Sequence, residues 1–353
     1  MSSLFTPLKI RDIEFKNRIF VSPMCQYSSE NGIPTDWHLV HLGSRAIGGA
    51  ALVMAEATAV SSEGRISPAD TGIWSDKQVE AFKKITGFIK KNGAVPGVQL
   101  AHAGRKASTQ IPWIGNGPLK ADEGAWQTIA PSSIPFTAGY PVPKEMNDNY
   151  IKKVISEFKT ATVNALNAGF EVIEIHMAHG YLLHQFLSPL TNKRKDKYGD
   201  GLERRLAFPL EVAEEVRKLI PDRLPLFVRI SATDWVTGGW DLPQSIEFAK
   251  KLKQTGIDFI DCSTGGLVPG VKIPLNPGYQ IPFAEAIRNE VKIFTGGVGL
   301  ITKPEQAEQI IEAHRADAVS LAREFLRDPY WPLHAAEVLN EQITWPDQYL
   351  RAR

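Results

Sequence analysis

Runs typical of β-strands alternate with amphipathic helical runs along almost the whole chain, and this alternation constrains the fold more than any other feature. Parallel strands need a long crossover connection, which is usually a helix. Eight strand runs are predicted, at 18–24, 51–57, 95–102, 172–179, 226–231, 259–263, 292–296 and 317–322. Eight strands with intervening helices predict an α/β fold, a closed (β/α)8 or TIM barrel.

The helical runs carry apolar residues three and four positions apart, as a helix with one buried face requires. In the run 75–92, Val79, Phe82 and Ile89 share a face, and Gly93 follows as a stop signal. The other predicted helices are 150–167, 203–219, 243–255, 282–289, 304–314 and 328–339. An open doubly wound sheet is the rival fold, but no GxGxxG motif follows the first strand.

One barrel can use the whole length of 353 residues, so a single domain over 1–353 is expected. A short hairpin is predicted before the first strand. Segment 104–147, between the third strand and its helix, is rich in Pro, Gly and Ser and contains Trp113 and Trp126. Such a long loop is usually functional. We expect a capping insertion over the carboxyl ends of the strands, with a disordered insertion as the alternative.

The charge balance and the cysteine content exclude several classes of protein. Lys and Arg total 40 against 39 Asp and Glu, so the chain has no excess of positive charge that would attract nucleic acid or an anionic membrane. Two cysteines, Cys25 and Cys262, are too few for an iron–sulfur cluster. The start lacks the apolar core of a signal peptide, and the longest apolar stretch is interrupted by Glu56. A cytoplasmic enzyme with a small-molecule substrate is expected.

Catalytic residues of a barrel lie at the carboxyl ends of its strands. No cluster of carboxylates converges there, which argues against a glycosidase. The seventh and eighth strands end near Gly297 and at Ala322 and Arg323. Glycine lets backbone N–H groups approach an anion, and arginine adds a two-pronged donor. These loops therefore predict a phosphate site, with turn glycines and a surface arginine as the alternative.

Arg229 lies in an otherwise apolar strand, where a permanent cation must be paired. Its partner could be Glu174 on the fourth strand, or a cofactor that becomes anionic, such as a reduced flavin. Both interpretations stay open at this stage.

His176 and His179 are three residues apart, a spacing that puts side chains on opposite faces of a regular strand. They can converge only if the chain leaves extended geometry near His179. Two neutral imidazoles could then polarise one substrate oxygen. A metal-binding pair and a purely structural pair are the alternatives.

Longer strings are more specific. They read Ser22-Pro23-Met24-Cys25-Gln26-Tyr27, then QLAHAGR at 99–105, HMAHGYLLHQFLSP at 176–189 and NKRKDKYG at 192–199. These strings resemble the old yellow enzymes, a family of NADH:flavin oxidoreductases. The thermophilic-like branch, which also carries SPMC with a cysteine, is the most similar, and the resemblance spans 4–349.

The resemblance implies an FMN-dependent ene-reductase. NAD(P)H would reduce the flavin, which would then reduce the C=C bond of an α,β-unsaturated carbonyl compound in a ping-pong cycle. His176 and His179 would bind the carbonyl oxygen, Tyr181 would donate the proton, and Tyr27 would line the substrate pocket. The implied cofactor contacts are Ser22, Pro23, Met24, Cys25, Ala57, Gln99, Arg229, Gly297, Ala322 and Arg323.

The chain departs from the family pattern at Tyr198-Gly-Asp-Gly, where Tyr-Gly-Gly-Ser is usual, and its cap is longer than in the shortest relatives. Its end, 347–353, resembles a tail that enters a neighbouring subunit's active site. This implies a homo-oligomer with Arg351 acting in trans, whereas a frayed terminus is the alternative. Two other functions stay open: a metal-dependent barrel hydrolase and a non-catalytic barrel that binds a flavin or another ligand.

Overall fold

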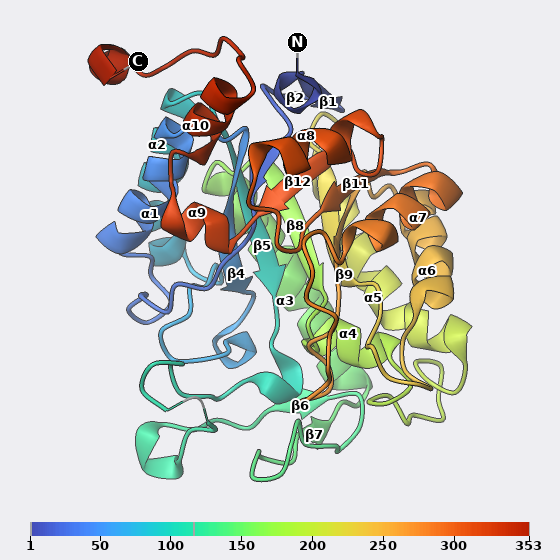
Figure 1. The fold of residues 1–353 in the computed structure, drawn as a ribbon. Coiled ribbons are helices and arrows are strands. Elements are labelled where there is room, and N and C mark those ends of the chain that lie inside the picture. The colour runs from blue at the N-terminus through green and yellow to red at the C-terminus, as the bar shows by residue number, and fades with distance from the viewer. Residues whose placement is uncertain (1, 116, 353) are drawn as a thin grey trace.

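Eight parallel strands form a closed ring in the computed structural model, which describes residues 2–115 and 117–352 (Figure 1). The ring runs β3-β4-β5-β8-β9-β10-β11-β12, and β12 pairs again with β3. The strands are β3 (Ile19–Val21), β4 (Leu52–Ala59), β5 (Val95–Ala101), β8 (Val172–Met177), β9 (Leu226–Ser231), β10 (Phe259–Ser263), β11 (Phe294–Gly297) and β12 (Ala318–Leu321). The predicted (β/α)8 barrel is confirmed.

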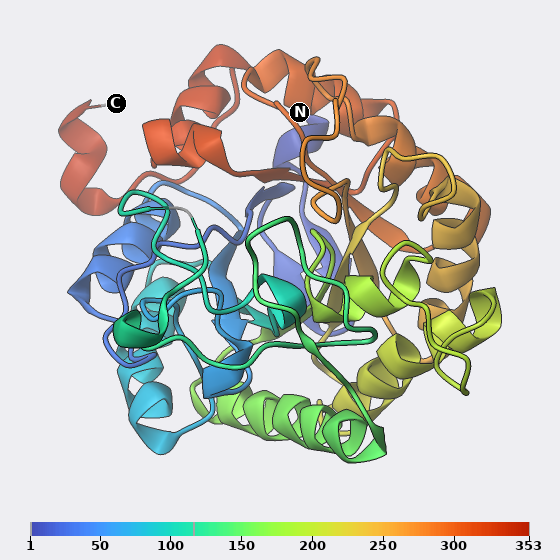
Figure 2. The ribbon, with the colours of Figure 1, turned by 90° about the horizontal axis from the view of Figure 1, so that it is seen from below.

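Helices surround the ring (Figure 2). They are α1 (Asp36–Ile47), α2 (Asp76–Lys91), α3 (Asp148–Asn167), α5 (Leu202–Arg217), α6 (Leu242–Gln254), α7 (Ile281–Val291), α8 (Pro304–Glu312) and α10 (Trp331–Val338), with the short helices α4 (Leu182–Leu187) and α9 (Arg323–Arg327). Among the described residues, no helix is both long enough and apolar enough to cross a bilayer.

The structure differs from the predicted elements in one missed helix and in the bounds of others. Helix α1 was missed because its buried face carries His38, His41 and Arg45, which hide the apolar period. The predicted strand from 292 begins later because Lys292 is the left-handed C-cap of α7, with φ 56°. In place of the predicted helix 328–339 the structure has the shorter helix α10, and the separate short helix α9 precedes it.

The N-terminal hairpin, β1 (Leu8–Ile10) and β2 (Ile13–Phe15), is confirmed and closes the amino end of the barrel. The buried ring of Phe15 lies 4.9 Å from that of Phe20 and 6.3 Å from that of Phe227, centre to centre. Phe227 in turn stacks on Phe259 at 4.3 Å. These aromatic rings fill the amino end of the interior, so the open end of the barrel is the carboxyl end.

Segment 104–147 extends across the carboxyl ends of the strands, as the view from below shows (Figure 2). It contains the short elements η3 (Gly104–Lys106), η4 (Ala121–Glu123), β6 (Ile129–Ala130) and β7 (Lys144–Glu145). It is tied down by contacts such as that of the Trp126 indole N–H, which donates to the Glu63 carbonyl at 2.9 Å.

We expect Phe15→Ala to lower the free energy of unfolding by about 3–5 kcal/mol, because it removes a buried ring and leaves a cavity at the barrel base. Urea unfolding would measure the loss. Glu14→Ala, at an exposed position of the same strand, is the matched control and should change stability by less than about 0.5 kcal/mol. Equal stabilities of the two variants would show that the hairpin does not plug the barrel.

Candidate active site

The turn after β8 brings the two predicted histidines together. The chain leaves extended geometry at His179, with φ 56°, and at Gly180, with φ 73°. The ring centres of His176 and His179 are 5.1 Å apart, and His176 Nε2 lies 3.4 Å from His179 Nδ1. This is the departure from strand geometry that the three-residue spacing requires, and it comes from an αL turn.

Both imidazoles are neutral hydrogen-bonding groups. The Ala178 N–H donates to His176 Nδ1 at 3.2 Å, so the ring proton of His176 is on Nε2. His179 Nε2 lies 2.7 Å from Ser263 Oγ. Burial, and next the Arg229 cation, hold the pKa of both histidines well below the usual value. The pair therefore carries no positive charge, and His176 Nε2 is an N–H donor.

Tyr181 lies on the same turn, and its ring packs edge-on against His176 with centres 5.0 Å apart. Burial raises its pKa well above the usual value, so the phenol keeps its proton. Lys106 Nζ lies 4.9 Å from the centre of the Tyr181 ring and donates to the carbonyls of His179 and Gly266. Sequence reasoning missed Lys106, although it directly follows the string 99–105.

A small cavity of about 10 Å³ adjoins Tyr181. It is lined by Ala57, Ala59, Gly64, Ile66, Asp70, Ala101, Ala103 and Tyr181. Asp70 is buried, and burial raises its pKa to about 7, although Ser67 and the Ile66 amide donate to it. No sequence pattern indicated Asp70, because its position depends on the folded loop after β4.

Arg229 pairs with Asp261 and not with Glu174, the internal partner that the sequence left open beside an anionic cofactor. Its Nε lies 3.2 Å from Asp261 Oδ2, and β9 and β10 place the two residues side by side. Glu174 instead accepts from Gln99 Nε2 at 2.7 Å. Burial, and for Glu174 next the charge of Asp261, raise the pKa of both carboxyls, while Arg229 opposes the shift. One guanidinium thus faces two acids that cannot easily both be ionised.

The segment that holds Ser22, Pro23, Met24 and Cys25 follows β3. Within the described chain the buried Ser22 Oγ has no hydrogen-bond partner. Burial raises the pKa of the half-buried Cys25 thiol well above the usual value, so it is neutral rather than a thiolate. The same segment continues to Tyr27, whose ring meets Trp113 of segment 104–147 edge-on at 5.9 Å.

A β-bulge positions this segment. The register of β4 against β5 shifts between Ala55 and Ala57, at Glu56. The buried Glu56 carboxylate accepts from the Gln26 amide at 2.9 Å and lies 3.0 Å from His38 Nε2. Ala57, a predicted cofactor contact, is the next residue and is buried.

A hollow of about 120 Å³ lies where the phosphate site was predicted. Residues 298–302 and 320–324 line it with Tyr279, Gln280 and Arg327, so Ala322 and Arg323 belong to it. Gly297 ends β11 just before it, and a Cβ there would meet Ile281 Cδ1 at 2.5 Å.

Another hollow, of about 550 Å³, lies at the amino end and contains none of the predicted site residues. Its arginines are already paired, Arg11 with Asp258 and Arg288 with Asp317. It is not the candidate site.

The carboxyl end therefore has features that a phosphate-bearing cofactor needs. Among the described residues the buried Ser22 Oγ has no hydrogen-bond partner, and Arg229 Nε has the ion-pair contact with Asp261 but no hydrogen bond. The hollow beside Arg323 lies at the same face, where barrels commonly bind phosphate. Among the described residues, no group of three or more His, Cys, Asp or Glu side chains is placed to hold a metal ion.

Arg351 is not part of this site within its own chain. It is exposed on the terminal helix η5 (Asp347–Ala352), which projects from the outside of the barrel (Figures 1 and 2). A contact between the hydroxyls of Tyr330 and Tyr349, 3.1 Å apart, ties η5 to the N-terminal end of α10.

We expect Arg323→Gln to weaken FMN binding about tenfold to a hundredfold, because a charge-assisted hydrogen bond is worth about 1.5–3 kcal/mol. Titration of flavin-free protein, followed by quenching of flavin fluorescence, would measure it. Riboflavin, which lacks the phosphate, should bind the variant and the wild type equally. Arg315→Gln, whose side chain pairs with Glu285 outside the hollow, is the control. A parallel loss for riboflavin would remove Arg323 from phosphate binding.

Comparisons with known proteins agree with this geometry. Residues 3–342 match the model of the NADH:flavin oxidoreductase / NADH oxidase family. The NADPH dehydrogenase of Listeria innocua is 48% identical over 354 residues, covering 100% of this chain and 99% of the relative. That of Bacillus velezensis is 48% identical over 351 residues, covering 99% and 98%.

Among solved structures, morphinone reductase is similar with a TM-score of 0.80 and 25% identity, covering 98% of this chain and 92% of that one. An old yellow enzyme homologue from Zymomonas mobilis has a TM-score of 0.79 and 28% identity, covering 97% and 94%. The chain therefore belongs to the NADH:flavin oxidoreductase / NADH oxidase family, the family of the old yellow enzymes, and is an FMN-dependent NAD(P)H oxidoreductase.

Proposed function

We propose that this flavin oxidoreductase is an ene-reductase, which reduces the C=C bond of α,β-unsaturated carbonyl compounds such as enones. The observation that carries the proposal is the turn after β8, where two neutral imidazoles lie beside the protonated phenol of Tyr181. FMN, when bound, supplies an acceptor for the hydride of NAD(P)H and a donor of hydride to an electron-poor carbon. Family membership takes precedence over the hydrolase and the non-catalytic barrel as explanations.

His176 and His179 bind the carbonyl oxygen of the substrate. Negative charge grows on this oxygen as the C=C bond is reduced, and fixed N–H donors stabilise it more in the transition state than in the ground state. Because both rings are buried and neutral, they donate without adding a charge that would have to be desolvated. When the substrate binds, its carbonyl oxygen contacts His176 Nε2 and His179 Nδ1, and the direct contact between these two nitrogens is lost.

Tyr181 protonates the α-carbon. A phenol is a weak acid, but a carbon that gains carbanion character needs no stronger one. Burial lowers the pKa of Lys106 to about 8, so its ammonium is mostly charged at neutral pH. Lying 4.9 Å from the ring centre, it stabilises the negative charge that Tyr181 acquires on losing its proton.

The remaining predicted contacts follow the strand ends. Ser22, Pro23, Met24, Cys25 and Ala57 would lie along the flavin ring, Gln99 and Arg229 at its pyrimidine edge, and Gly297, Ala322 and Arg323 near the phosphate. The position of Arg229 supports its role as a cofactor contact. Its guanidinium contacts Asp261, and it could also balance the negative charge that a bound flavin gains on reduction.

Substrates enter between the barrel and the insertion. We propose one FMN-binding domain over 1–353, with 104–147 as its cap and Tyr27 in the substrate pocket. The edge-on contact of Tyr27 with Trp113 supports the cap, since it links the insertion to the segment that carries Cys25.

Stopped-flow measurement of the two half-reactions tests this function. With the wild type, NADPH should reduce bound flavin, and 2-cyclohexenone should reoxidise it with formation of cyclohexanone. Tyr181→Phe should slow the second half-reaction about 10²–10⁴-fold, the usual contribution of a general acid, and leave the first almost unchanged. Equal slowing of both half-reactions, or a wild type that cyclohexenone does not reoxidise, would contradict the proposal.

We also propose that the protein forms homo-oligomers in which Arg351 of one chain reaches the active site of its neighbour. The helices α1, α9 and α10 lie on the side of the barrel from which η5 projects (Figure 1). Exposed apolar side chains on these helices support this proposal. These side chains are Trp37, Val40, Leu326 and Val338, and Leu350 lies on η5 itself.

Removal of residues 347–353 should therefore raise the Michaelis constant for the enone severalfold, because the substrate pocket loses a cation supplied in trans. Steady-state kinetics would measure this effect, and light scattering would give the number of subunits. Arg351→Ala should raise the Michaelis constant without changing the subunit number. Unchanged constants and an unchanged assembly would show that the end is a solvated terminus.

A further inference from the structure

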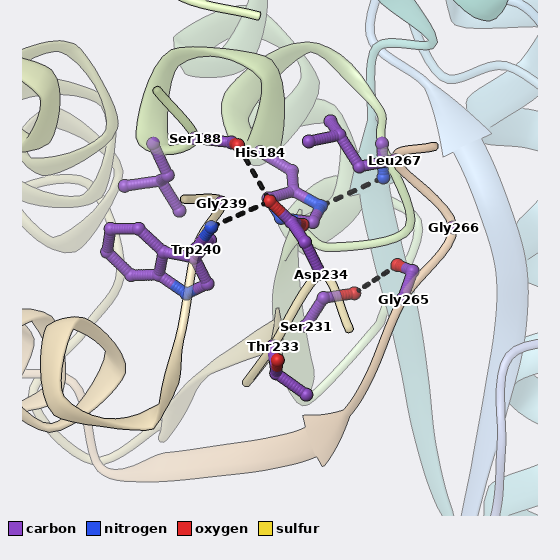
Figure 3. Close-up of polar contacts among 12 residues, drawn as sticks. His184, Ser188, Ser231, Thr233, Asp234, Gly239, Trp240, Gly265, Gly266 and Leu267 are labelled. Atoms are coloured by element: carbon purple, nitrogen blue, oxygen red, sulfur yellow. Dashed lines mark hydrogen bonds and ion pairs between the residues drawn. The ribbon is translucent and has the colours of Figure 1, made fainter. Parts of the chain in front are cut away.

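A buried cluster lies behind the turn that carries His179 and Tyr181. Asp234, in the loop after β9, contacts His184 of α4, with His184 Nε2 3.0 Å from Asp234 Oδ1. Both side chains are completely buried. The other carboxylate oxygen accepts from Ser188 Oγ at 2.7 Å and from the Trp240 amide at 2.8 Å (Figure 3).

The hydrogen bonds fix the tautomer of His184. The Gly180 N–H donates to His184 Nδ1 at 2.9 Å, so Nδ1 carries no proton, and the ring proton is on Nε2, which lies 3.0 Å from Asp234 Oδ1. Burial raises the pKa of Asp234, but His184, Ser188 and the Trp240 amide outweigh it and hold this pKa below the usual value. An ionised carboxylate thus orients an imidazole, and the imidazole holds a backbone amide.

That amide is in the most constrained part of the turn. His179 and Gly180 both have positive φ, a conformation that is strained for a non-glycine residue such as His179. A Cβ on Gly180 would lie 2.4 Å from the Gly266 carbonyl oxygen, so the loop after β10 packs directly on the turn.

Other contacts hold the rest of the turn. Ser231 Oγ accepts from the His179 amide at 2.9 Å. It also donates to the Gly265 carbonyl at 2.8 Å (Figure 3). Lys106 donates to the His179 carbonyl. Each neighbour therefore fixes one backbone group, and His184 fixes the one between His179 and Tyr181.

We propose that His184 and Asp234 are positioning residues of the active site: the Asp234 carboxylate sets the His184 tautomer, and His184 Nδ1 holds the Gly180 amide so that His179 and Tyr181 face the substrate together. The inference rests on the proposed function of those two side chains in alkene reduction. It goes beyond an ion pair that only stabilises the fold, because it assigns the effect to one nitrogen of the ring.

Two substitutions separate the two nitrogens. In His184→Asn the amide oxygen lies near the position of Nδ1 and can still accept from Gly180, but no donor reaches Asp234. In His184→Gln the terminal amide nitrogen lies near the position of Nε2 and still donates to Asp234, but the Gly180 amide loses its acceptor. A merely structural ion pair predicts that His184→Asn is worse, since an unpaired buried carboxylate is strongly destabilising.

Positioning predicts opposite orders for catalysis and stability. With flavin-loaded enzyme, reoxidation by cyclohexenone should be slowed less than about tenfold in His184→Asn and about a hundredfold in His184→Gln, because a misplacement of about 1 Å costs that much. Urea unfolding should show His184→Gln to be at least as stable as His184→Asn. Rates that follow the order of the stabilities would overturn the proposal.

A second measurement does not depend on alkene reduction. In the nitrogen NMR spectrum of the wild-type holoenzyme, the His184 ring, assigned by its loss in His184→Asn, should have its proton on Nε2 and none on Nδ1. A proton on Nδ1 would overturn the inference even if the enzyme is active. Failure of the proposed function would appear separately, as a wild type that cyclohexenone does not reoxidise while the His184 tautomer is as expected.

Discussion

Closing eight parallel strands into a ring gathers eight strand ends at one face, and the candidate active site lies at that face. Pairing of β12 with β3 brings Ser22 and Arg323 to the same end of the barrel, although they lie near opposite ends of the sequence. The hairpin and the ring of Phe15 fill the other end. One end is therefore packed for stability and the other carries polar groups whose partners are incomplete.

Those incomplete groups are informative about function because burial makes them costly. Arg229 shares the interior with Asp261 and Glu174, and the pKa values of these two carboxyl groups are raised. A proton is therefore retained in a cluster that water cannot screen. The turn after β8 is likewise held in a costly geometry by contacts to its backbone. Both features are explained if the mouth of the barrel must meet negative charge at fixed positions, first on a cofactor and then on a substrate oxygen.

The sequence predicted the barrel well because most strands and helices have their own periodic pattern. For His176 and His179 it gave only the condition for convergence, a break in extended geometry near His179, while their shared role came from the family resemblance. It did not predict α1, whose buried face is polar. It named Glu174 as one candidate partner of Arg229 and did not find Asp261, because the pairing depends on register: β10 places Asp261 directly beside Arg229, whereas Glu174 lies beside Gln99 and Phe227. Lys106 and Asp234 were missed for the same reason, since only tertiary packing brings them to the turn.

The most direct test is to add FMN to flavin-free protein under anaerobic conditions and to follow the flavin absorption as NADPH and then cyclohexenone are supplied. A barrel whose carboxyl end holds the cofactor beside Arg229 and the two histidines should bind one FMN per chain, lose its yellow colour with NADPH and regain it with the enone. This description of the site would be contradicted if the protein bound no FMN, or if the bound flavin stayed oxidised after NADPH was added.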